Sequence, residues 1–198
     1  MHRAKSVEGL SRKSQELYLA VFCARYLDLF LPHRHWTALV AYNTAMKVFF
    51  IAASATIVAY FHKMPWKATY QEAHDTLRHA LFLVLPSLAL GFLLASEWTP
   101  LEVLYTFSIV LESVAIWPQL VVLQRDRNVE NLTANFVFAL GVYRGFYILN
   151  WAHRYLAENH VTETVVWVFG VIQTCFYIDF FYYYYQAAKR GRELVLPR

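Results

Sequence analysis

Six long apolar runs dominate this sequence and limit what it can fold into. A helix needs about 20 mostly apolar residues to cross the roughly 30 Å of hydrocarbon in a bilayer, and it satisfies its own backbone hydrogen bonds there. The sequence therefore predicts an all-α, polytopic membrane helix bundle with six spans in the lipid bilayer. The runs cover residues 17–31, 38–61, 80–94, 101–123, 136–151 and 161–185.

The composition favours a single transmembrane domain over residues 1–198, without a separate soluble domain. Of the 198 residues, 58% are hydrophobic and only 16% are charged, whereas a soluble domain carries about 25% charged residues. We expect residues 1–16 to form an N-terminal segment, residues 17–187 the six-helix bundle and residues 188–198 a tail.

Lys and Arg are distributed unevenly between the connections, and this predicts the orientation of the bundle. The N-terminal segment holds four of them, the 62–78 connection three, the 124–134 connection two and the tail four, whereas the opposite side holds Arg34 and Arg154. Because basic residues are enriched on the cytoplasmic side, both termini are expected in the cytoplasm, as an even number of spans permits. The net charge of +4 reflects this bias, and we expect no binding to nucleic acid.

Seven ionisable residues lie inside the apolar runs, where a charged side chain costs about 2.5–3.5 kcal/mol. These groups are expected to face a shared polar interior and to pair with each other or with a ligand. Arg25 and Asp28 are three residues apart and are expected to pair on the same helix face, whereas Lys47 is interpreted as structural or interfacial. The seven residues are Arg25, Asp28, Lys47, Glu102, Glu112, Arg144 and Asp179.

Polar and aromatic residues form a stripe at helical spacing along the fifth run. Together with Arg25, the two arginines of this run are expected to line a water-filled cavity open to the exoplasmic side. Guanidinium groups suit carboxylates, because they donate paired, charge-assisted hydrogen bonds to them. The alternative is structural: ion pairs that hold helices together and an interfacial belt of aromatic residues. The stripe consists of Tyr143, Tyr147, Asn150, Trp151 and Arg154, with Arg144 beside it.

The sequence offers no arrangement of residues that favours catalysis. Cys23 and Cys175 lie in apolar runs and are expected to behave as small apolar residues. The histidines lie near connections and span ends, without metal-ligand spacing at membrane depth, and there is no glycine-rich phosphate loop. We therefore expect a protein that is not an enzyme and that uses neither a cofactor nor a metal.

Several segments, spread over residues 11–197, share a pattern with a known family. They are 25–30 (RYLDLF), 42–44 (YNT), 106–109 (TFSI), 111–120 (LESVAIWPQL), 140–144 (LGVYR), 150–155 (NWAHRY), 173–174 (QT) and 179–182 (DFFY). In this order they resemble the KDEL receptors, the ER lumen protein-retaining receptors. The resemblance implies the fold of the SWEET and PQ-loop transporters, with Pro118 and Gln119 as the PQ pair.

The resemblance implies a receptor that binds the C-terminal Lys/His-Asp-Glu-Leu tails of soluble ER-resident proteins in the acidic Golgi. Such receptors are multi-pass proteins of the ER and Golgi membranes that return in COPI vesicles and release their cargo at the higher pH of the ER. Acid pH is expected to favour binding through protonation of a site coupled to Glu112. The alternative within the same fold is a transporter for a small solute, against which the three arginines argue.

Matching positions imply where the end of such a tail would bind. The terminal carboxylate is expected at Arg25 and Tyr26, near Tyr143 and Arg144. Glu112, paired with Tyr143 and Arg144, resembles the internal lock of the family.

The remaining tail residues are assigned in the same way. Arg154 and Trp151 are expected to take the Asp of the signal, and Asp28 and Glu102 are expected to suit its basic first residue. Tyr105 stands where the family usually has Trp, a difference that bears on the choice between Lys- and His-headed signals. The wall of the site is completed by Tyr147 and Asn150.

The C-terminal tail is expected to recruit the COPI coat. In the family, basic residues after the last helix become accessible when cargo binds. Lys189, Arg190 and Arg192 occupy that region, although the family's lysine pair is not reproduced after Gly191. Asp179 is grouped with them as a residue for trafficking.

The chain departs from the family at its beginning. Family members have seven spans and a luminal N-terminus, whereas Met1 opens directly into the segment before the second family span. The first family span supplies an arginine for the Glu of the signal and a histidine for pH sensing, and residues 1–16 offer no replacement at membrane depth. The preferred explanation is an incomplete version of a receptor of ordinary length, and the other is an altered or defective receptor.

Overall fold

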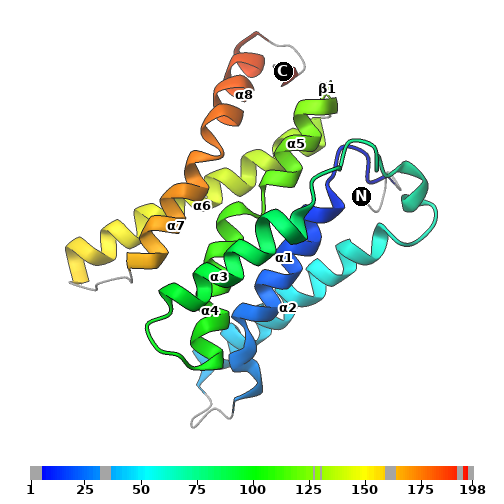
Figure 1. The fold of residues 1–198 in the computed structure, drawn as a ribbon. Helices are drawn as coiled ribbons and strands as arrows, with labels where there is room; N and C mark the ends of the chain where they lie inside the picture. The colour runs from blue at the N-terminus through cyan, green and yellow to red at the C-terminus, as the bar shows by residue number, and fades with distance from the viewer. Residues whose placement is uncertain are drawn as a thin grey trace.

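The computed structural model describes residues 6–31, 37–126, 128–129, 131–158, 164–190 and 194–195, and it confirms an all-α bundle. The long helices lie side by side (Figure 1), with α1 against α2 and α4, α3 against α4, and α7 against α4 and α6. They are α1 (Arg12–Arg25), α2 (Ala38–Tyr60), α3 (Leu85–Leu94), α4 (Pro100–Val114), α5 (Trp117–Asp126), α6 (Asn131–Glu158), α7 (Thr164–Cys175) and α8 (Ile178–Arg190). Short 3₁₀ helices cover Leu27–Phe30 and Trp66–Thr69, and a π-helical turn, Ala80–Val84, leads into α3.

Two short strands, which the sequence did not predict, join the ends of α5 and α8. Strand β1 (Asn128–Val129) pairs antiparallel with β2 (Leu194–Val195), with Asn128 opposite Val195. Figure 1 shows this pair at the same end of the bundle as the start of the chain. The expectation that both termini lie on the cytoplasmic side of the membrane stays a prediction.

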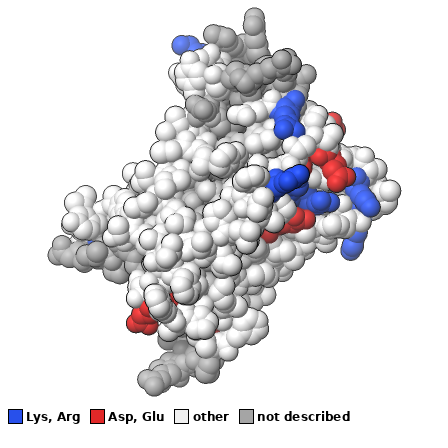
Figure 2. Space-filling model, viewed as in Figure 1, with Lys and Arg blue, Asp and Glu red and all other residues white. Residues whose placement is uncertain are grey.

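Among the residues that the structure describes, three helical segments are long and apolar enough to cross a membrane, by length and composition. They are Ala38–Tyr60, Pro100–Arg125 and Thr164–Gln186, and the apolar helix Ala80–Leu94 is shorter. Helices α1 and α6 overlap the first and fifth predicted runs, so each run corresponds to helix, while the number of spans stays a prediction. In Figure 2, charged side chains gather at the end that holds the N-terminus, and the middle of this face is uncharged, as a bilayer requires.

Hydroxyl caps fix where three helices begin. The Ser11 hydroxyl accepts a hydrogen bond from the Ser14 N–H at the start of α1 (3.1 Å). The Thr37 and Thr99 hydroxyls accept hydrogen bonds from amides in the first turns of α2 and α4, at 3.3 Å each. Ser and Thr are favoured at this position because their side-chain oxygen satisfies an amide that has no partner within the helix.

The predicted fourth run is broken into α4 and α5 at residues 115–116, because Pro118 has no N–H to donate to the preceding turn. Ser14 of α1 inserts at this break. Its hydroxyl donates to the carbonyl of Ala115 and accepts from the N–H of Gln119 at 3.3 Å. In a continuous helix these two groups would bond to each other, so the side chain of one helix satisfies the interrupted backbone of another.

The side chain of Gln119, which is 1% exposed, holds the N-terminal segment against the break. Its Oε1 accepts from the N–H of Ser11 and its Nε2 donates to the carbonyl of Gly9, both at 2.8 Å. Asp75 of the α2–α3 connection accepts hydrogen bonds from the hydroxyls of Ser11 (3.1 Å) and Tyr70 (2.8 Å). Burial and the bond to Asp75 raise the pKa of Tyr70.

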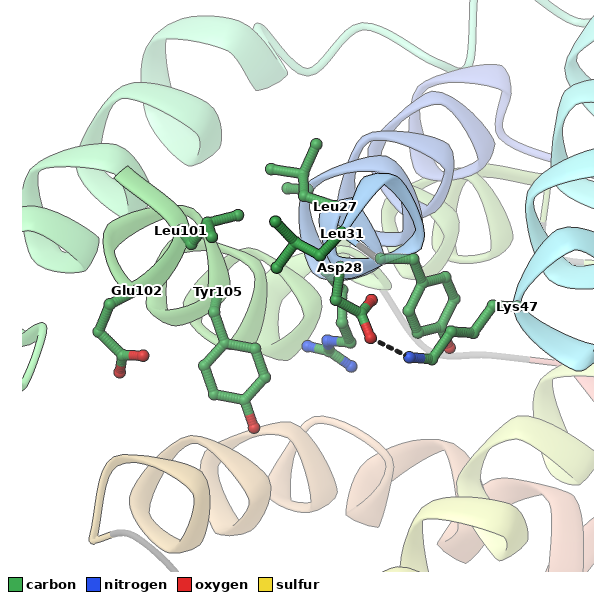
Figure 3. Close-up of a pocket in the computed structure, with 10 residues that line it drawn as sticks. Leu27, Asp28, Leu31, Lys47, Leu101, Glu102 and Tyr105 are labelled. Atoms are coloured by element: carbon green, nitrogen blue, oxygen red, sulfur yellow. Dashed lines mark hydrogen bonds and ion pairs between the residues drawn. The ribbon is translucent and has the colours of Figure 1, made fainter. Parts of the chain in front are cut away.

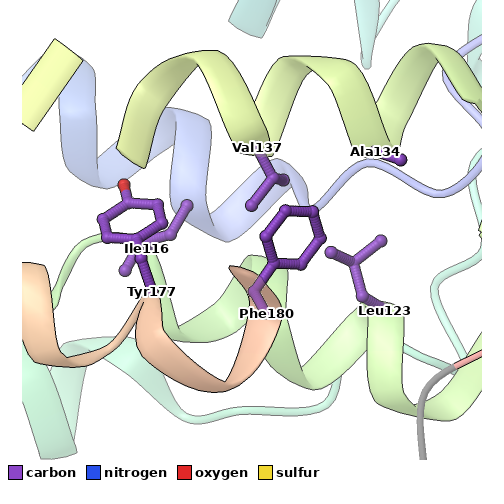
Figure 4. Close-up of a cluster of buried hydrophobic side chains, with 6 residues drawn as sticks. All are labelled: Ile116, Leu123, Ala134, Val137, Tyr177 and Phe180. Atoms are coloured by element: carbon purple, nitrogen blue, oxygen red, sulfur yellow. The ribbon is translucent and has the colours of Figure 1, made fainter. Parts of the chain in front are cut away.

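In the described part of the chain, two clusters of buried apolar side chains hold helices together. One connects α5 and α6 to the start of α8 (Figure 4) through Ile116, Leu123, Ala134, Val137, Tyr177 and Phe180. The other packs α1 and the π-helical turn before α3 against α4 through Leu17, Val21, Leu83, Phe107, Leu111 and Ala115. Gly91 lets α3 approach α4 closely, since a Cβ there would lie 2.7 Å from the Cα of Phe107. The second cluster fixes the position of α1 along α4, and therefore the turn of α4 that Arg25 faces.

Candidate functional site

A pocket of about 430 Å³ lies where α1 ends and α4 begins. Its wall consists of the end of α1, the 3₁₀ turn that follows, one lysine of α2 and the first turns of α4 (Figure 3). The lining residues are Ala24, Arg25, Tyr26, Leu27, Asp28, Leu31, Lys47, Leu101, Glu102 and Tyr105. The structure thus brings five of the predicted site residues to one cavity: Arg25, Tyr26, Asp28, Glu102 and Tyr105.

Arg25 and Arg144 share the carboxylate of Glu112. Arg25 Nη1 lies 2.5 Å from Oε2 of Glu112, and Arg144 Nη1 lies 3.3 Å from Oε1. The three side chains are 20%, 7% and 10% exposed, in the order Arg25, Arg144 and Glu112. Glu112 pairs with Arg144, as expected from the sequence, and Arg25 is an additional partner. The expected pairing of Glu112 with Tyr143 stays a prediction. Two guanidinium groups and one carboxylate leave one positive charge without an anion in this triad.

The guanidinium of Arg25 is held in place by hydrogen bonds, but one of its nitrogens has no hydrogen-bond partner in the described part of the chain. Its Nε donates to the hydroxyl of Ser108 at 3.1 Å, and that hydroxyl donates to the carbonyl of Tyr105 at 2.6 Å. Arg25 Nη2 and Arg144 Nε have no hydrogen-bond partner in the described part of the chain. Arg25 lines the pocket, and because buried donors are normally bonded, its unpaired Nη2 favours a ligand that brings oxygen acceptors.

Asp28 forms an ion pair with Lys47 (Figure 3). The expectation that Arg25 and Asp28 pair on one helix face is wrong, because α1 ends at Arg25 and Asp28 lies in the 3₁₀ turn Leu27–Phe30. Both line the pocket, but each has a different partner. Lys47 forms an ion pair, as a structural residue would, and it also lines the pocket, 5.7 Å from the ring of Tyr26. It is the charged residue of the pocket that the sequence analysis did not assign to the site.

Glu102 and Tyr105 belong to the first two turns of α4. Thr99 caps this helix and Pro100 occupies its first position, and an acidic residue is favoured at that end by the helix dipole. Tyr105 follows one turn later and is 37% exposed. In Figure 3 both side chains lie on the opposite side of the pocket from Lys47. The pocket therefore combines carboxylates with the guanidinium group of Arg25.

The predicted stripe on α6 forms an aromatic ladder beside the triad. The rings of Tyr143 and Tyr147 lie 4.8 Å apart, and those of Tyr147 and Trp151 lie 6.1 Å apart. Arg144 lies 5.6 Å from the ring of Trp151, within reach of a cation–π contact. Trp151 packs over Gly170 of α7, where a Cβ would lie 2.5 Å from the ring. Gly170 leaves the space that the ring of Trp151 occupies. The sequence analysis did not identify it, because a single glycine in an apolar run does not indicate which side chain packs against it.

The other predicted residues lie outside the pocket. Asn150 is exposed and Arg154 is half-buried on α6, and within the described residues the pocket lining includes no α6 side chain. The predicted site is therefore two groups, the pocket and the ladder, which Glu112 joins. Of the trafficking residues, Asp179 and Arg190 are in α8 and Lys189 is exposed there, while Arg192 lies outside the described residues. In the described ranges, no three His, Cys, Asp or Glu side chains are grouped to hold a metal ion.

Comparison with known proteins identifies the family. A profile of the ER lumen protein retaining receptors matches residues 6–154. The chain is 49% identical to the ER lumen protein-retaining receptor of Petunia hybrida, over 100% of this chain and 89% of that protein. It is 49% identical to ER lumen protein-retaining receptor B of Arabidopsis thaliana over the same shares, and 44% identical to the receptor of Drosophila melanogaster over 98% of this chain and 88% of that protein. The chain therefore belongs to the ER lumen protein-retaining receptor family, and it is a multi-span membrane receptor and not an enzyme, as the sequence predicted.

Proposed function

We propose that this receptor binds the C-terminal KDEL- or HDEL-type tails of soluble ER-resident proteins in the Golgi and returns them to the ER. The names of the relatives describe retention of proteins of the ER lumen, which supports retention as the task. The chemistry of the pocket supports a short acidic tail with a free carboxylate as the ligand.

The observation that carries this proposal is the net positive charge of the Arg25–Glu112–Arg144 triad, two guanidinium groups on one carboxylate. A terminal carboxylate would add the second anion and would accept hydrogen bonds from the open Nη2 of Arg25. Such bonds between ionised groups are shorter and stronger than neutral ones. A sugar has no carboxylate and would leave the charge of the triad without a partner, so the pocket favours a ligand with a free carboxylate over a sugar.

The remaining groups match the rest of the tail. Asp28 and Glu102 line the same pocket as Arg25 and would bind the basic first residue of the signal. Trp151 and Arg154 lie further along α6 and would receive its Asp. Because Glu112 contacts both Arg25 and Arg144, it links the pocket to the ladder, and a tail that lies across both would contact one connected set of charges.

The same proposal includes a pH-dependent step. Acid pH would favour binding through protonation of a site coupled to Glu112. A tenfold difference in affinity between Golgi and ER requires only about 1.4 kcal/mol of differential binding, and a single proton in a poorly solvated site can supply that.

Transport would depend on the opposite end of the molecule. Lys189 is exposed near the end of α8, and this end lies with the N-terminus in Figure 1. Residues 188–198 would form a cytoplasmic tail that recruits the COPI coat. This tail and the segment 1–16 would lie on the cytoplasmic side of the 17–187 bundle. These assignments complete the proposed cycle between the Golgi and the ER.

Binding of labelled HDEL and KDEL peptides to membranes that contain the receptor tests the proposal. At about pH 5.5, roughly one unit below the reference pKa of His, Arg25→Ala and Arg154→Ala are each expected to weaken binding at least tenfold, because truncating one partner of a buried charged contact costs roughly 2–5 kcal/mol. Arg78→Ala, which removes an exposed arginine from the 62–78 connection, is the matched control and should bind like wild type.

A peptide with an amidated C-terminus serves as the second control, because it lacks the carboxylate that the triad would bind. If the amidated peptide binds as tightly as the free acid, or if Arg25→Ala binds like Arg78→Ala, the carboxylate is not recognised at Arg25 and the proposal fails.

A further inference from the structure

Lys47 places an ammonium group of the protein inside the proposed binding pocket. It projects from α2, and its Nζ pairs with Oδ2 of Asp28. The side chains of Lys47 and Asp28 are 27% and 47% exposed, so the pair faces the cavity and is not sealed within the bundle. The second carboxylate oxygen of Asp28, Oδ1, has no hydrogen-bond partner in the described part of the chain.

We propose that Lys47 is an intramolecular competitor for the basic first residue of the tail. In the structure it occupies the carboxylate of Asp28, and a ligand ammonium gains that carboxylate by displacing Lys47. This inference rests on the proposed function and deepens it. It assigns to Lys47 the control of how strongly the receptor prefers a basic first residue in the signal.

The geometry suits an exchangeable contact. Partly exposed ion pairs contribute little to stability, and the lysine side chain has four rotatable methylenes that let its ammonium move without a change in the helix. The ring of Tyr26, 5.7 Å from Nζ, offers the displaced ammonium a neighbouring aromatic face. A ligand cation can therefore replace Lys47 at Asp28 while α2 stays in place.

Competition of this kind predicts a selective effect of removing the ammonium. A Lys-headed tail must break the pair of Lys47 with Asp28, whereas an Ala-headed tail leaves that pair intact. Lys47→Met should therefore bind a KDEL peptide about fivefold more tightly than wild type does, since an ion pair of this exposure is worth about 1 kcal/mol at most. Binding of an ADEL peptide should be unchanged, so that the preference for KDEL over ADEL rises about fivefold.

The experiment measures dissociation constants of KDEL and ADEL peptides on membranes containing wild type, Lys47→Met, Lys47→Gln and Lys47→Arg. Lys47→Gln repeats the loss of charge with a polar side chain, in case the methionine variant folds poorly, and Lys47→Arg should retain the wild-type preference. Lys63→Met removes an exposed lysine just beyond the C-terminal end of α2 and should leave both constants unchanged. In Asp28→Asn/Lys47→Met, the gain for KDEL should disappear.

The outcomes separate this inference from the proposed function. If wild type binds neither peptide, the proposed function is overturned and the competitor role with it. If wild type binds KDEL but the variants keep its preference, the competitor role alone is overturned. Equal losses for both peptides in Lys47→Met and Lys47→Gln also overturn it, because they show that Lys47 supports the fold or contacts the acidic part of the tail.

Discussion

Replacement of Gln119 by alanine should destabilise the whole bundle, although the residue lies far from the pocket. The substitution leaves the N–H of Ser11 and the carbonyl of Gly9 without their partners, both of which lie 2.8 Å from the Gln119 amide. Ser11 and Gly9 are buried, and an unmet buried polar group costs about 1–3 kcal/mol. The loss of two bonds therefore predicts a cost of roughly 2–6 kcal/mol. For a chain of this size, that cost corresponds to a fall in Tm of roughly 5–20 °C.

The matched control is Gln124→Ala, the same substitution at an exposed position of the same helix, which should change Tm by less than about 2 °C, as surface substitutions usually do. The measurement is thermal unfolding of the detergent-solubilised receptor, followed by the loss of the monodisperse peak in size-exclusion chromatography. Equal melting temperatures for Gln119→Ala and Gln124→Ala would show that the hydrogen bonds of Gln119 carry no net stability, and the argument from unmet backbone groups would be refuted.

Two further predictions concern packing and a hydrogen bond outside the spans. Gly170→Ala should displace Trp151, whose ring would lie 2.5 Å from the new Cβ, and should lower the free energy of unfolding by about 1–3 kcal/mol, as overpacking does. Gly145→Ala, where a Cβ meets nothing within 4 Å, should be neutral or slightly stabilising. Equal melting temperatures of the two variants would contradict this prediction. Tyr70→Phe removes the bond to Asp75. Because the pKa of Tyr70 is raised in the folded protein, its stabilisation is complete below about pH 10, the unfolded value, and is lost as pH rises further. The Tm difference between wild type and Tyr70→Phe should therefore be constant from pH 7 to 9 and smaller at pH 11, and a difference that grows with pH would disprove the assignment.

The sequence was sufficient to predict the helices and that charged residues within the apolar runs would pair inside the bundle, because both follow from local properties. Apolar length marks the runs, and a charge such as Glu112 within a run must find a partner. Pairings were less predictable. The i, i+3 rule placed Asp28 beside Arg25, but the rule holds only within a continuous helix, and α1 ends at Arg25. The 3₁₀ turn that follows directs Asp28 toward Lys47 of α2 instead.

Long-range partners explain the residues that sequence reasoning did not resolve. Gln119 was recognisable as half of the PQ pair, but its partner Ser11 is 108 positions away. A buried amide can be satisfied by any nearby backbone group, so its partner depends on how helices pack and not on the sequence around it. The same holds for Gly170, whose small size has meaning only because Trp151 of another helix lies against it.

Helices α1 and α4 are joined by polar contacts at both ends of their apolar interface, and this determines where the binding chemistry lies. Arg25 contacts Ser108 and Glu112 at the pocket, while Ser14 contacts the α4–α5 break. These two positions of α1 are 11 residues apart, or about 16 Å along the helix. With both ends fixed, α1 cannot slide along α4 without breaking charged or buried hydrogen bonds. The guanidinium of Arg25 is therefore held in one orientation toward the pocket, so the positive charge proposed to bind a carboxylate is positioned by the bundle as a whole.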